Sequence, residues 1–524
     1  MKRWIIALSV FAVLGFPQAA INQERGKYPP PRFPSYVKPP KSLDDVLPFA
    51  RAAVRQTGGR TPLGLVEKGQ TVAIFTEPAA EEMILQGIKR AYEERGVKVQ
   101  MVAEHQLLGV KKEEALKAIK ANRWYTSEHG YMEVRSWILQ RFGDAEIPKS
   151  WLKERRPDLY KAVFQKEEES SQELIEPHGS RFYGNFIFVN RYELMNKAAT
   201  FPGDIWRLAE ERVIEPLSWI DRVEVSDPEG TRFSFELNEK QAQAWADGVY
   251  QQGHLFMFPH QATGRFPYSS VDYPAFTKKY NPRYLVKVNG VFAGTNNHTG
   301  SFSKMEVHVK DGYVKEVKGG GTYGELWREF LKYPKINEAT YPYHDQPGYW
   351  WIYEAGMGTN PKFFKRPDEN MEGSNSSERN NAGVIHWGFG LRLDHGPDKA
   401  VESKEWMDFA KQNALPNDHW WHIHNFLPTY RVKVRGTKNS WLTLIDRGEV
   451  TALKSPEIRA LASRYGNPDE VLSDDWAPHL PGVNAPGKFE DYAKDPWKTL
   501  TAVINKIQAG SYEYFYPEVK TKKP

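Results

Sequence analysis

The chain contains no cysteine. This absence excludes disulfide bonds, thiolate metal ligands, cysteine nucleophiles and a lipid anchor attached through a cysteine. A protein without cysteine is compatible with an oxidising compartment, although it does not require one.

The chain also carries little net charge for its length. Its 524 residues include 71 lysines and arginines and 66 aspartates and glutamates, which leaves a net charge of +5. The basic residues are scattered among acidic ones, so the sequence lacks the basic stripe typical of nucleic-acid binding. Hydrophobic residues make up 40% and charged residues 26%, as in ordinary soluble proteins. We expect two or three domains and no nucleic-acid partner.

The apolar run at the N-terminus is too short to span a bilayer comfortably. It covers 13 residues from Trp4 to Phe16, follows two basic residues and precedes Ala19-Ala20. This pattern is typical of a cleaved signal peptide over residues 1–20, although Gln18 stands where a small residue is preferred. An uncleaved membrane anchor is the alternative. We expect a secreted or periplasmic protein with no stable membrane span after cleavage.

A dinucleotide fingerprint is also missing. Residues 71–75 form a short apolar run, residues 77–95 have apolar positions at helical spacing, and residues 97–102 form a second apolar run. Strand, helix and strand joined by short turns predict a parallel sheet. The first turn lacks Gly-x-Gly-x-x-Gly, so we do not expect a dinucleotide site.

The second half of the chain has the alternation of antiparallel strands. Residues 221–237 predict a β-hairpin, Asp311-Gly312 predicts a tight hairpin turn within residues 306–317, and residues 441–450 predict a last β pair. We therefore expect an α/β plus β-rich fold, with an N-terminal parallel-sheet α/β domain followed by a mixed, mainly antiparallel metal-bearing domain. The expected divisions are a signal peptide (1–20), a Pro-rich lead (21–60), the α/β domain with a charged helical insert (61–220), the β-rich domain (221–455) and a C-terminal helical extension (456–524).

The residues with the clearest chemistry lie between positions 350 and 430. In an extended segment, His422 and His424 project from the same side and turn Ile423 into the core. His386 and Gly388 share a face for the same reason, and the glycine leaves room beside the imidazole. These histidines and Glu354 form a set suited to Zn, Fe or Mn. The alternative is a group of hydrogen-bonded histidines in an aromatic-rich core.

With these predicted elements and motifs in this order, the chain resembles the aminopeptidase T (leucyl aminopeptidase) family of metallopeptidases. The related dihydroxypyridine dioxygenases use one iron on a similar scaffold. The resemblance covers roughly residues 66–102 and 223–450. It is carried by GTRFSF at 230–235, the Asp311-Gly312 hairpin ending in Gly319-Gly320, EAGMGTNP at 354–361, HWGFG at 386–390 and HIH at 422–424.

The resemblance implies a site with two metals held by two glutamates, two histidines and an aspartate. Glu354 matches the second glutamate, His386 the first histidine and His422 the second histidine. His424 stands where the family has its aspartate, so a neutral ligand would replace a carboxylate.

Two further departures concern the first glutamate and a tyrosine of the family. The segment that normally carries the first glutamate corresponds to residues 258–265, which contain no glutamate, and His260 is the residue that could substitute. Leu391-Arg392-Leu393 stands where the peptidases have their tyrosine. With two carboxylates fewer, a single-metal site is at least as well supported as a pair.

The leading expectation is an exported metal-dependent hydrolase of aminopeptidase type. A divalent transition metal (Zn, Co, Mn or Fe) would activate a water, and Glu354 would act as a ligand or as the catalytic group that handles the proton. The alternatives are a mononuclear non-haem iron dioxygenase that opens an aromatic ring and a non-catalytic binding protein on the same fold. The expected partner is a small peptide or a small aromatic substrate, and a homodimer stays open.

Overall fold

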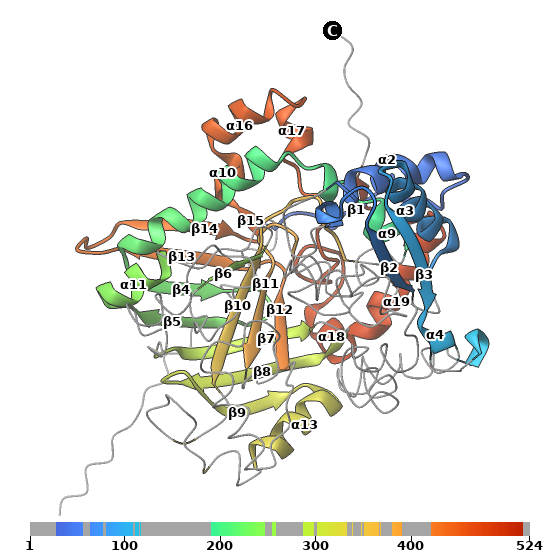
Figure 1. Ribbon diagram of the computed structural model, residues 1–524. Helices are drawn as coiled ribbons and strands as arrows, with labels where there is room; N and C mark the ends of the chain where they lie inside the picture. The colour runs from blue at the N-terminus through green and yellow to red at the C-terminus, as the bar shows by residue number, and fades with distance from the viewer. Residues whose placement is uncertain are drawn as a thin grey trace, which may run out of the picture.

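The computed structural model describes most of the chain outside the N-terminus and a few long segments (Figure 1). The described residues are 28–55, 63–76, 80–107, 111–114, 116, 190–246, 254–257, 287–297, 301–332, 338, 347, 351–365, 367, 380–389 and 421–516. The predicted signal peptide, most of the charged insert and His260 lie outside the described residues. No helix in the described ranges is long and apolar enough to cross a membrane.

Two antiparallel sheets make up the centre of the molecule, as Figure 1 shows. The larger sheet has eight strands in the order β15 (Glu449–Val450), β14 (Trp441–Asp446), β13 (Thr429–Val434), β4 (Ile220–Ser226), β5 (Arg232–Glu236), β7 (Asn289–Asn296), β8 (Ser301–Lys310) and β9 (Tyr313–Gly319). The smaller sheet has four strands in the order β12 (Trp421–Asn425), β11 (Ile385–Phe389), β10 (Ile352–Gly358) and β6 (His254–Phe256).

The predicted hairpins are confirmed. β4 pairs with β5, and β8 pairs with β9 around the turn Asp311-Gly312. Both turn residues have positive φ, 53° for Asp311 and 88° for Gly312, as the tight turns that match the twist of paired strands require. Arg447 and Gly448 repeat this conformation between β14 and β15, with φ of 51° and 86°.

Aromatic side chains fill the space between the two sheets. The Trp387 ring packs edge-on against Phe233 and Phe292, with ring centroids 5.1 and 5.4 Å apart. Strands β7 and β12 approach closely at Gly294, where a Cβ atom would lie 2.6 Å from Ile423 Cγ2. Ile423 is fully buried, as its position between two histidines predicted. The odd-numbered residues of β11 and β12 therefore face the large sheet, and their histidines face away from it.

A buried amide joins the two sheets beside this aromatic layer. Asn425 Oδ1 accepts a hydrogen bond of 2.6 Å from Trp387 Nε1, and Asn425 Nδ2 donates one of 2.9 Å to the carbonyl of Ala293. Thr231 Oγ1 lies 2.9 Å from the same Oδ1. Because these polar groups are buried, the network favours one relative placement of the sheets over others.

The N-terminal unit has the predicted strand–helix–strand order. β2 (Thr71–Thr76) and β3 (Lys98–Ala103) are parallel neighbours, joined through α3 (Glu82–Glu94). Helix α2 (Leu43–Ala53) packs on α3 at Gly87, where a Cβ atom would lie 2.5 Å from Val46 Cγ1. The mixed α/β fold class is therefore confirmed.

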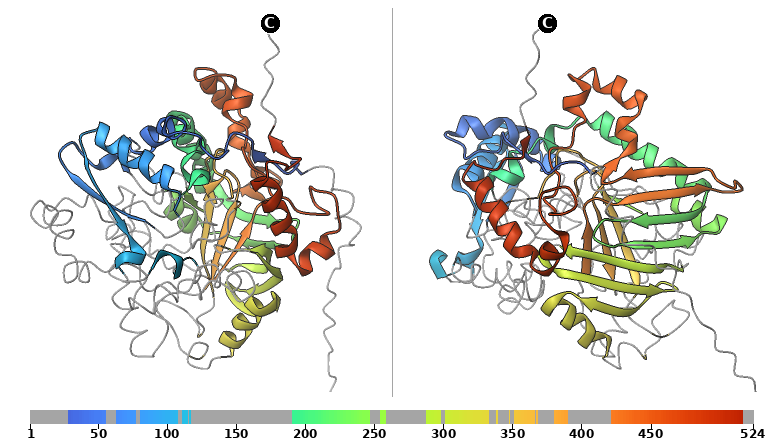
Figure 2. Two further views of the ribbon diagram at one scale, coloured as in Figure 1. Left: turned by 90° about the vertical axis from the view of Figure 1, so that its right-hand side faces the viewer. Right: turned by 180° about the vertical axis from the view of Figure 1, so that it is seen from behind.

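Further helices surround the sheets. They are α4 (Glu104–Leu107), α9 (Arg191–Leu194), α10 (Gly203–Ile214), α11 (Glu239–Ala246), α13 (Gly321–Leu331), α16 (Pro456–Ala462), α17 (Pro468–Val471), α18 (Phe489–Lys494) and α19 (Pro496–Gln508). In the right-hand view of Figure 2, the N-terminal unit in blue and helices α18 and α19 in red both lie beyond the same end of the strands of the large sheet. Strand β1 (Phe33–Pro34) pairs in parallel with β16 (Phe515–Tyr516), which joins the two ends of the described chain.

Candidate metal centre

Three neighbouring strands of the smaller sheet carry the central side chains of the site. Glu354 is on β10, His386 on β11 and His422 on β12. Glu354 lies opposite Gly388, and Gly388 lies opposite His422, so these three positions form one row across the sheet. The sequence-predicted residues Glu354, His386 and His422 are therefore brought together by strand pairing.

Gly388 leaves the space in which this group meets. A Cβ atom at Gly388 would lie 2.7 Å from Glu354 Cβ and 3.1 Å from both Glu354 Oε2 and His422 Nε2. Any larger side chain would stand between the carboxylate and the imidazole. The sequence predicted room beside the imidazole of His386, and the room that Gly388 leaves lies instead beside Glu354 and His422 on the two neighbouring strands.

The Glu354 carboxylate lies between the two imidazoles. Its Oε1 is 3.1 Å from His386 Nε2, and its Oε2 is 3.2 Å from His422 Nε2. All three residues are buried, with at most 2% of their surface exposed. A buried carboxylate is costly without positive charge or hydrogen bonds around it. The two imidazoles supply hydrogen bonds, and a cation would supply charge.

The donor set fits a single metal ion. One atom from each of the three residues can be chosen so that all three lie within 4.8 Å of one another. Two donors that each lie about 2.1 Å from one ion, at an angle of about 90–110°, are about 3.0–3.4 Å apart. The two observed separations, 3.1 and 3.2 Å, fall within this range. The same separations also fit hydrogen bonds between the imidazoles and the carboxylate. Metal analysis of the protein therefore distinguishes a bound metal from a hydrogen-bonded site without metal.

His424 lies beside this group but does not belong to it. It projects from the same face as His422, as predicted, and it lies opposite His386, with ring centroids 5.9 Å apart. Among the described residues, the group that could hold a metal contains Glu354, His386 and His422 without His424. His424 therefore flanks the candidate ligands, and whether it binds metal stays a prediction.

The remaining histidines do not extend the group within the described part of the chain. His260 lies outside the described residues, so its predicted role as a substitute ligand stays a prediction. His308 is on β8, half-buried and 3.4 Å from Glu306 Oε2, on the polar face where the sequence placed it. It therefore offers a matched control for the site histidines.

A tyrosine that sequence reasoning missed holds the strand that carries His422. The hydroxyl oxygen of Tyr323, on α13, accepts a hydrogen bond of 3.3 Å from the backbone N–H of His422 and donates one of 3.4 Å to its carbonyl. Among the described strands, β12 lies at the edge of its sheet, and this hydroxyl bonds backbone groups of that edge strand. Burial raises the pKa of Tyr323 to about 12, so the hydroxyl keeps its proton well above neutral pH. No local signal in the sequence marks this contact.

Thr359, the residue after β10, connects the other end of the site to helix α10. Thr359 Oγ1 donates a hydrogen bond of 2.6 Å to Glu210 Oε1 and accepts one of 2.8 Å from Trp206 Nε1. Both partners are on α10 and buried. The helix thus fixes the C-terminal end of the strand that carries Glu354.

Comparisons with known proteins leave the family of the chain open. No family model and no curated protein matches it. Among solved structures, it is similar to 2,5-dihydroxypyridine dioxygenase from Pseudomonas putida KT2440, with 11% sequence identity and a TM-score of 0.35. The match covers 78% of this chain and 98% of that chain. A likeness at this level carries no argument about fold or function, so the resemblance to the aminopeptidase T family stays a prediction.

Proposed function

We propose that the protein is a mononuclear metal-dependent enzyme in which Glu354, His386 and His422 hold one divalent transition metal. The observation that carries the proposal is the row of Glu354, Gly388 and His422 across three strands. In that row a glycine leaves open the space in which a carboxylate and two imidazoles converge. Two histidines and one carboxylate, with other positions left free, are the donor set of non-haem iron(II) oxygenases.

One ion fits this arrangement better than two. A pair of divalent ions needs several carboxylates to balance the charge. Within the described residues the group contains a single carboxylate, that of Glu354. The two-metal peptidase site implied by the sequence resemblance is therefore not assembled from the described residues.

The reaction class we favour is oxygenation of a small electron-rich aromatic substrate. Ferrous iron in such a set supplies chemistry with dioxygen that protein side chains lack. Glu354 would offset part of the charge of the cation, and the two imidazoles would bind as neutral ligands through Nε2. His424, beside His386, is placed to hold or release a proton at the edge of the site.

Hydrolysis by a single zinc ion is the second candidate. Two histidines and one glutamate also hold catalytic zinc, which lowers the pKa of a bound water. The adjacent imidazole of His424 favours this alternative because hydrolysis needs a proton acceptor that is not itself a ligand. Peptides remain the expected substrate class for this reaction.

Metal analysis of the purified full-length chain tests the common part of the proposal. We expect close to one transition-metal ion per chain. His386→Ala and His422→Ala should each lower metal affinity by ~10-fold or more, since even changes outside the ligand set cost that much. His308→Ala is the matched control and should bind metal as the unaltered chain does. Equal occupancy in all variants would show that the histidines are ordinary core residues.

A second experiment separates the two reactions. Protein loaded with ferrous iron without oxygen is mixed with dihydroxylated aromatic compounds, and oxygen uptake is followed with ring opening. Protein loaded with Zn, Co or Mn is assayed in parallel on short peptides. Oxygen uptake that depends on iron and His386 supports the oxygenase. Peptide release without oxygen would replace it with the hydrolase.

A further inference from the structure

A cavity separate from the metal centre lies under the C-terminal helices. It has a volume of about 60 Å³, is partly open, and is lined by residues from the ends of β7 and β8, the residue after β12, and helices α18 and α19. Figure 1 shows both helices beside these strand ends. Its described lining contains none of Glu354, His386 and His422. It is therefore a candidate binding site in its own right.

The charged groups at this cavity have one sign. Arg32 and Lys365 line it, and no aspartate or glutamate is among the described lining residues. Lys365 is only 6% exposed, and its Nζ lies 5.7 Å from the centroid of the Phe426 ring. A buried ammonium is costly unless an anion or strong acceptors surround it. The cavity thus favours an anionic occupant.

Glu229 is one acid that interacts with Lys365, and its surroundings disfavour its charged form. Glu229 is fully buried and interacts electrostatically with Lys365 and Lys304. Burial and the neighbouring Asp227 carboxylate raise the pKa of Glu229 to about 8. A buried carboxyl that holds its proton more tightly offsets less of the Lys365 charge, which leaves that charge for another anion.

A buried hydrogen-bond acceptor without a donor among the described residues adds a second requirement for the occupant of the cavity. Asn296 is 2% exposed, and its Nδ2 donates a hydrogen bond of 2.9 Å to Ser301 Oγ, which also lines the cavity. Asn296 Oδ1 is buried and accepts no hydrogen bond from the described residues. A buried acceptor without a donor is unfavourable, so a hydroxyl or amine on the occupant would stabilise the site.

The other walls and the volume indicate the size of the group that fits inside the cavity. They are apolar or aromatic, and include Phe426, Trp476, Leu480 and Leu500. One water-sized group needs about 10–15 Å³ of such volume, so about four to six non-hydrogen atoms fit. A short chain with one charged end and one hydroxyl satisfies the cation, the amide and the apolar walls together.

We propose that this cavity binds a short-chain 2-hydroxy carboxylate, the size of glycolate or lactate. Its carboxylate pairs with the ammonium of Lys365, and its hydroxyl donates to Asn296 Oδ1. The apolar remainder packs against the aromatic wall. Phe426, in that wall, also contacts His424, with ring centroids 6.4 Å apart, so the cavity adjoins the face of the sheet that carries the metal centre.

Isothermal titration of the full-length protein tests the proposal with lactate, propionate and lactamide. Lactamide keeps the shape but lacks the charge, and should bind at least ~10-fold more weakly than lactate because it loses a charge-assisted hydrogen bond. Lys365→Met should weaken lactate binding by a similar factor. Lys454→Met, at an exposed lysine, is the matched control and should leave it unchanged. Asn296→Leu should remove the preference for lactate over propionate.

Two further variants test whether lactate occupies this cavity and whether its binding depends on the metal centre. Leu500→Phe fills the cavity from the partly exposed side of α19 and should abolish binding while leaving the circular dichroism spectrum unchanged. His422→Ala, which acts on the metal centre, should retain lactate binding, so failure of the proposed metal site leaves this result intact. Equal binding of lactamide and lactate, unchanged binding in Lys365→Met, or loss of binding in His422→Ala would each overturn the proposal.

Discussion

At the scale of single residues, the candidate site depends on Gly388, which has no side chain. Glu354 and His422 are two strands apart, and their side chains can meet only by passing over β11. Directly opposite positions on adjacent strands are about 5 Å apart, so a residue with a Cβ at the middle position would fill the gap. Gly388 provides the gap, and Gly356 lies opposite His386 in the next row.

The first prediction concerns Gly388→Ala. The new methyl group would lie 2.7 Å from Glu354 Cβ, which is attached to the backbone and cannot swing away. We expect metal affinity to fall by ~10-fold or more, comparable to the loss of a supporting contact. Metal titration monitored by calorimetry measures the change.

The matched control for this prediction is Gly203→Ala. Apart from its chain neighbours and the backbone of its own helix, no atom lies within 4 Å of a Cβ at Gly203, and its φ is not in the left-handed region. Metal affinity should be unaltered in this variant. If Gly388→Ala also binds metal as tightly as the unaltered chain, the three side chains do not converge on one ion.

At the scale of secondary-structure elements, helices hold the strands that carry the site. α13 holds the edge strand β12 through Tyr323, and α10 holds the end of β10 through Thr359. An edge strand with unpaired backbone groups can shift or fray, which would move His422 relative to Glu354. The helices thus convert paired strands into a fixed ligand geometry.

The second prediction is that Tyr323→Phe weakens metal binding without removing a ligand. The variant keeps the buried ring but loses the hydroxyl that bonds both backbone groups of His422. We expect metal affinity to fall by up to ~10-fold, less than in His422→Ala, with a stability loss of about 1–3 kcal/mol from the unsatisfied backbone groups. Metal titration and urea unfolding measure the two effects. Affinity equal to that of the unaltered chain would limit Tyr323 to a packing role.

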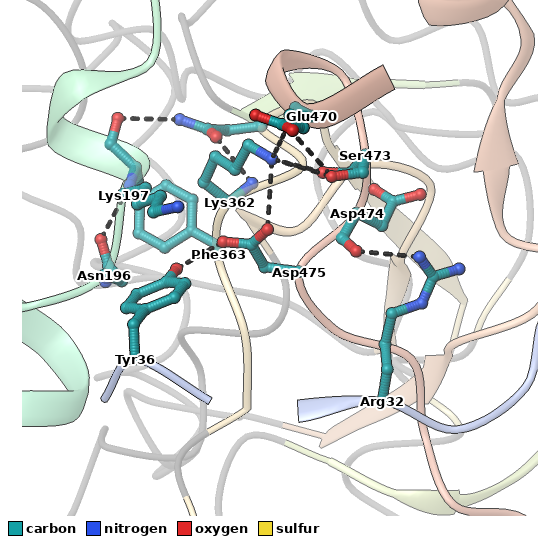
Figure 3. A network of polar contacts seen from close by, with 12 residues as sticks. Arg32, Tyr36, Asn196, Lys197, Lys362, Phe363, Glu470, Ser473, Asp474 and Asp475 are labelled. Atoms are coloured by element: carbon teal, nitrogen blue, oxygen red, sulfur yellow. Dashed lines mark hydrogen bonds and ion pairs between the residues drawn. The ribbon is translucent and has the colours of Figure 1, made fainter. Parts of the chain in front are cut away.

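A buried ion pair joins elements that are far apart in the sequence (Figure 3). Lys362 Nζ lies 3.1 Å from Asp475 Oδ1 and donates hydrogen bonds to the carbonyls of Glu470 and Ser473, at 3.0 and 2.6 Å. The Tyr36 hydroxyl donates to the other oxygen of Asp475. Burial lowers the pKa of Lys362 and, with the Asp475 charge and hydrogen bond, raises that of Tyr36. The cluster connects the N-terminal segment, the segment after β10 and the C-terminal extension.

The third prediction concerns Lys362→Met. Removing one partner leaves the Asp475 carboxylate buried without its cation, which should lower the free energy of unfolding by about 3–5 kcal/mol. Urea denaturation measures the loss. The double variant Lys362→Met, Asp475→Asn removes both charges and should be more stable than the single variant. If the double variant is the less stable one, the carboxylate is not the source of the cost.

At the scale of the whole molecule, buried acids make stability depend on pH. Burial raises the pKa of Asp227 to about 7, and burial together with the Asp227 charge raises that of Glu229 to about 8. Burial likewise raises the pKa of Asp474 to about 7. Each folded-state value lies above the ordinary value of 3.8 or 4.5, so the folded state binds protons that the unfolded chain has released. The stability from these groups is complete below about pH 4 and is lost as pH rises towards about 8.

The fourth prediction follows for Glu229→Gln. The amide oxygen can still accept the hydrogen bond of Thr295, which is 2.5 Å long in the unaltered chain, but no charge forms at high pH. We expect a smaller fall in the unfolding temperature between pH 5 and pH 8 than in the unaltered chain. Scanning calorimetry at several pH values measures it. Glu316→Gln, at an exposed position, should follow the unaltered curve, and a Glu229→Gln curve that also does so would contradict the assignment.

The sequence by itself determined the local elements and the faces of their side chains. The turn at Asp311-Gly312, the parallel strands around α3 and the shared face of His422 and His424 depend on backbone geometry within a few residues. Such geometry is written in neighbouring residue types, so patterns of period two or of helical spacing reveal it.

Only the tertiary structure decided which of these side chains meet. β13 pairs with β4 about two hundred positions earlier in the chain, and Tyr323 reaches His422 from a separate helix. Whether His422 or His424 joins Glu354 depends on a strand register, and a shift of two residues would exchange them. The cavity at Lys365 depends likewise on where α18 and α19 dock. These choices rest on the fit of surfaces distant in sequence, which no short stretch of residues encodes.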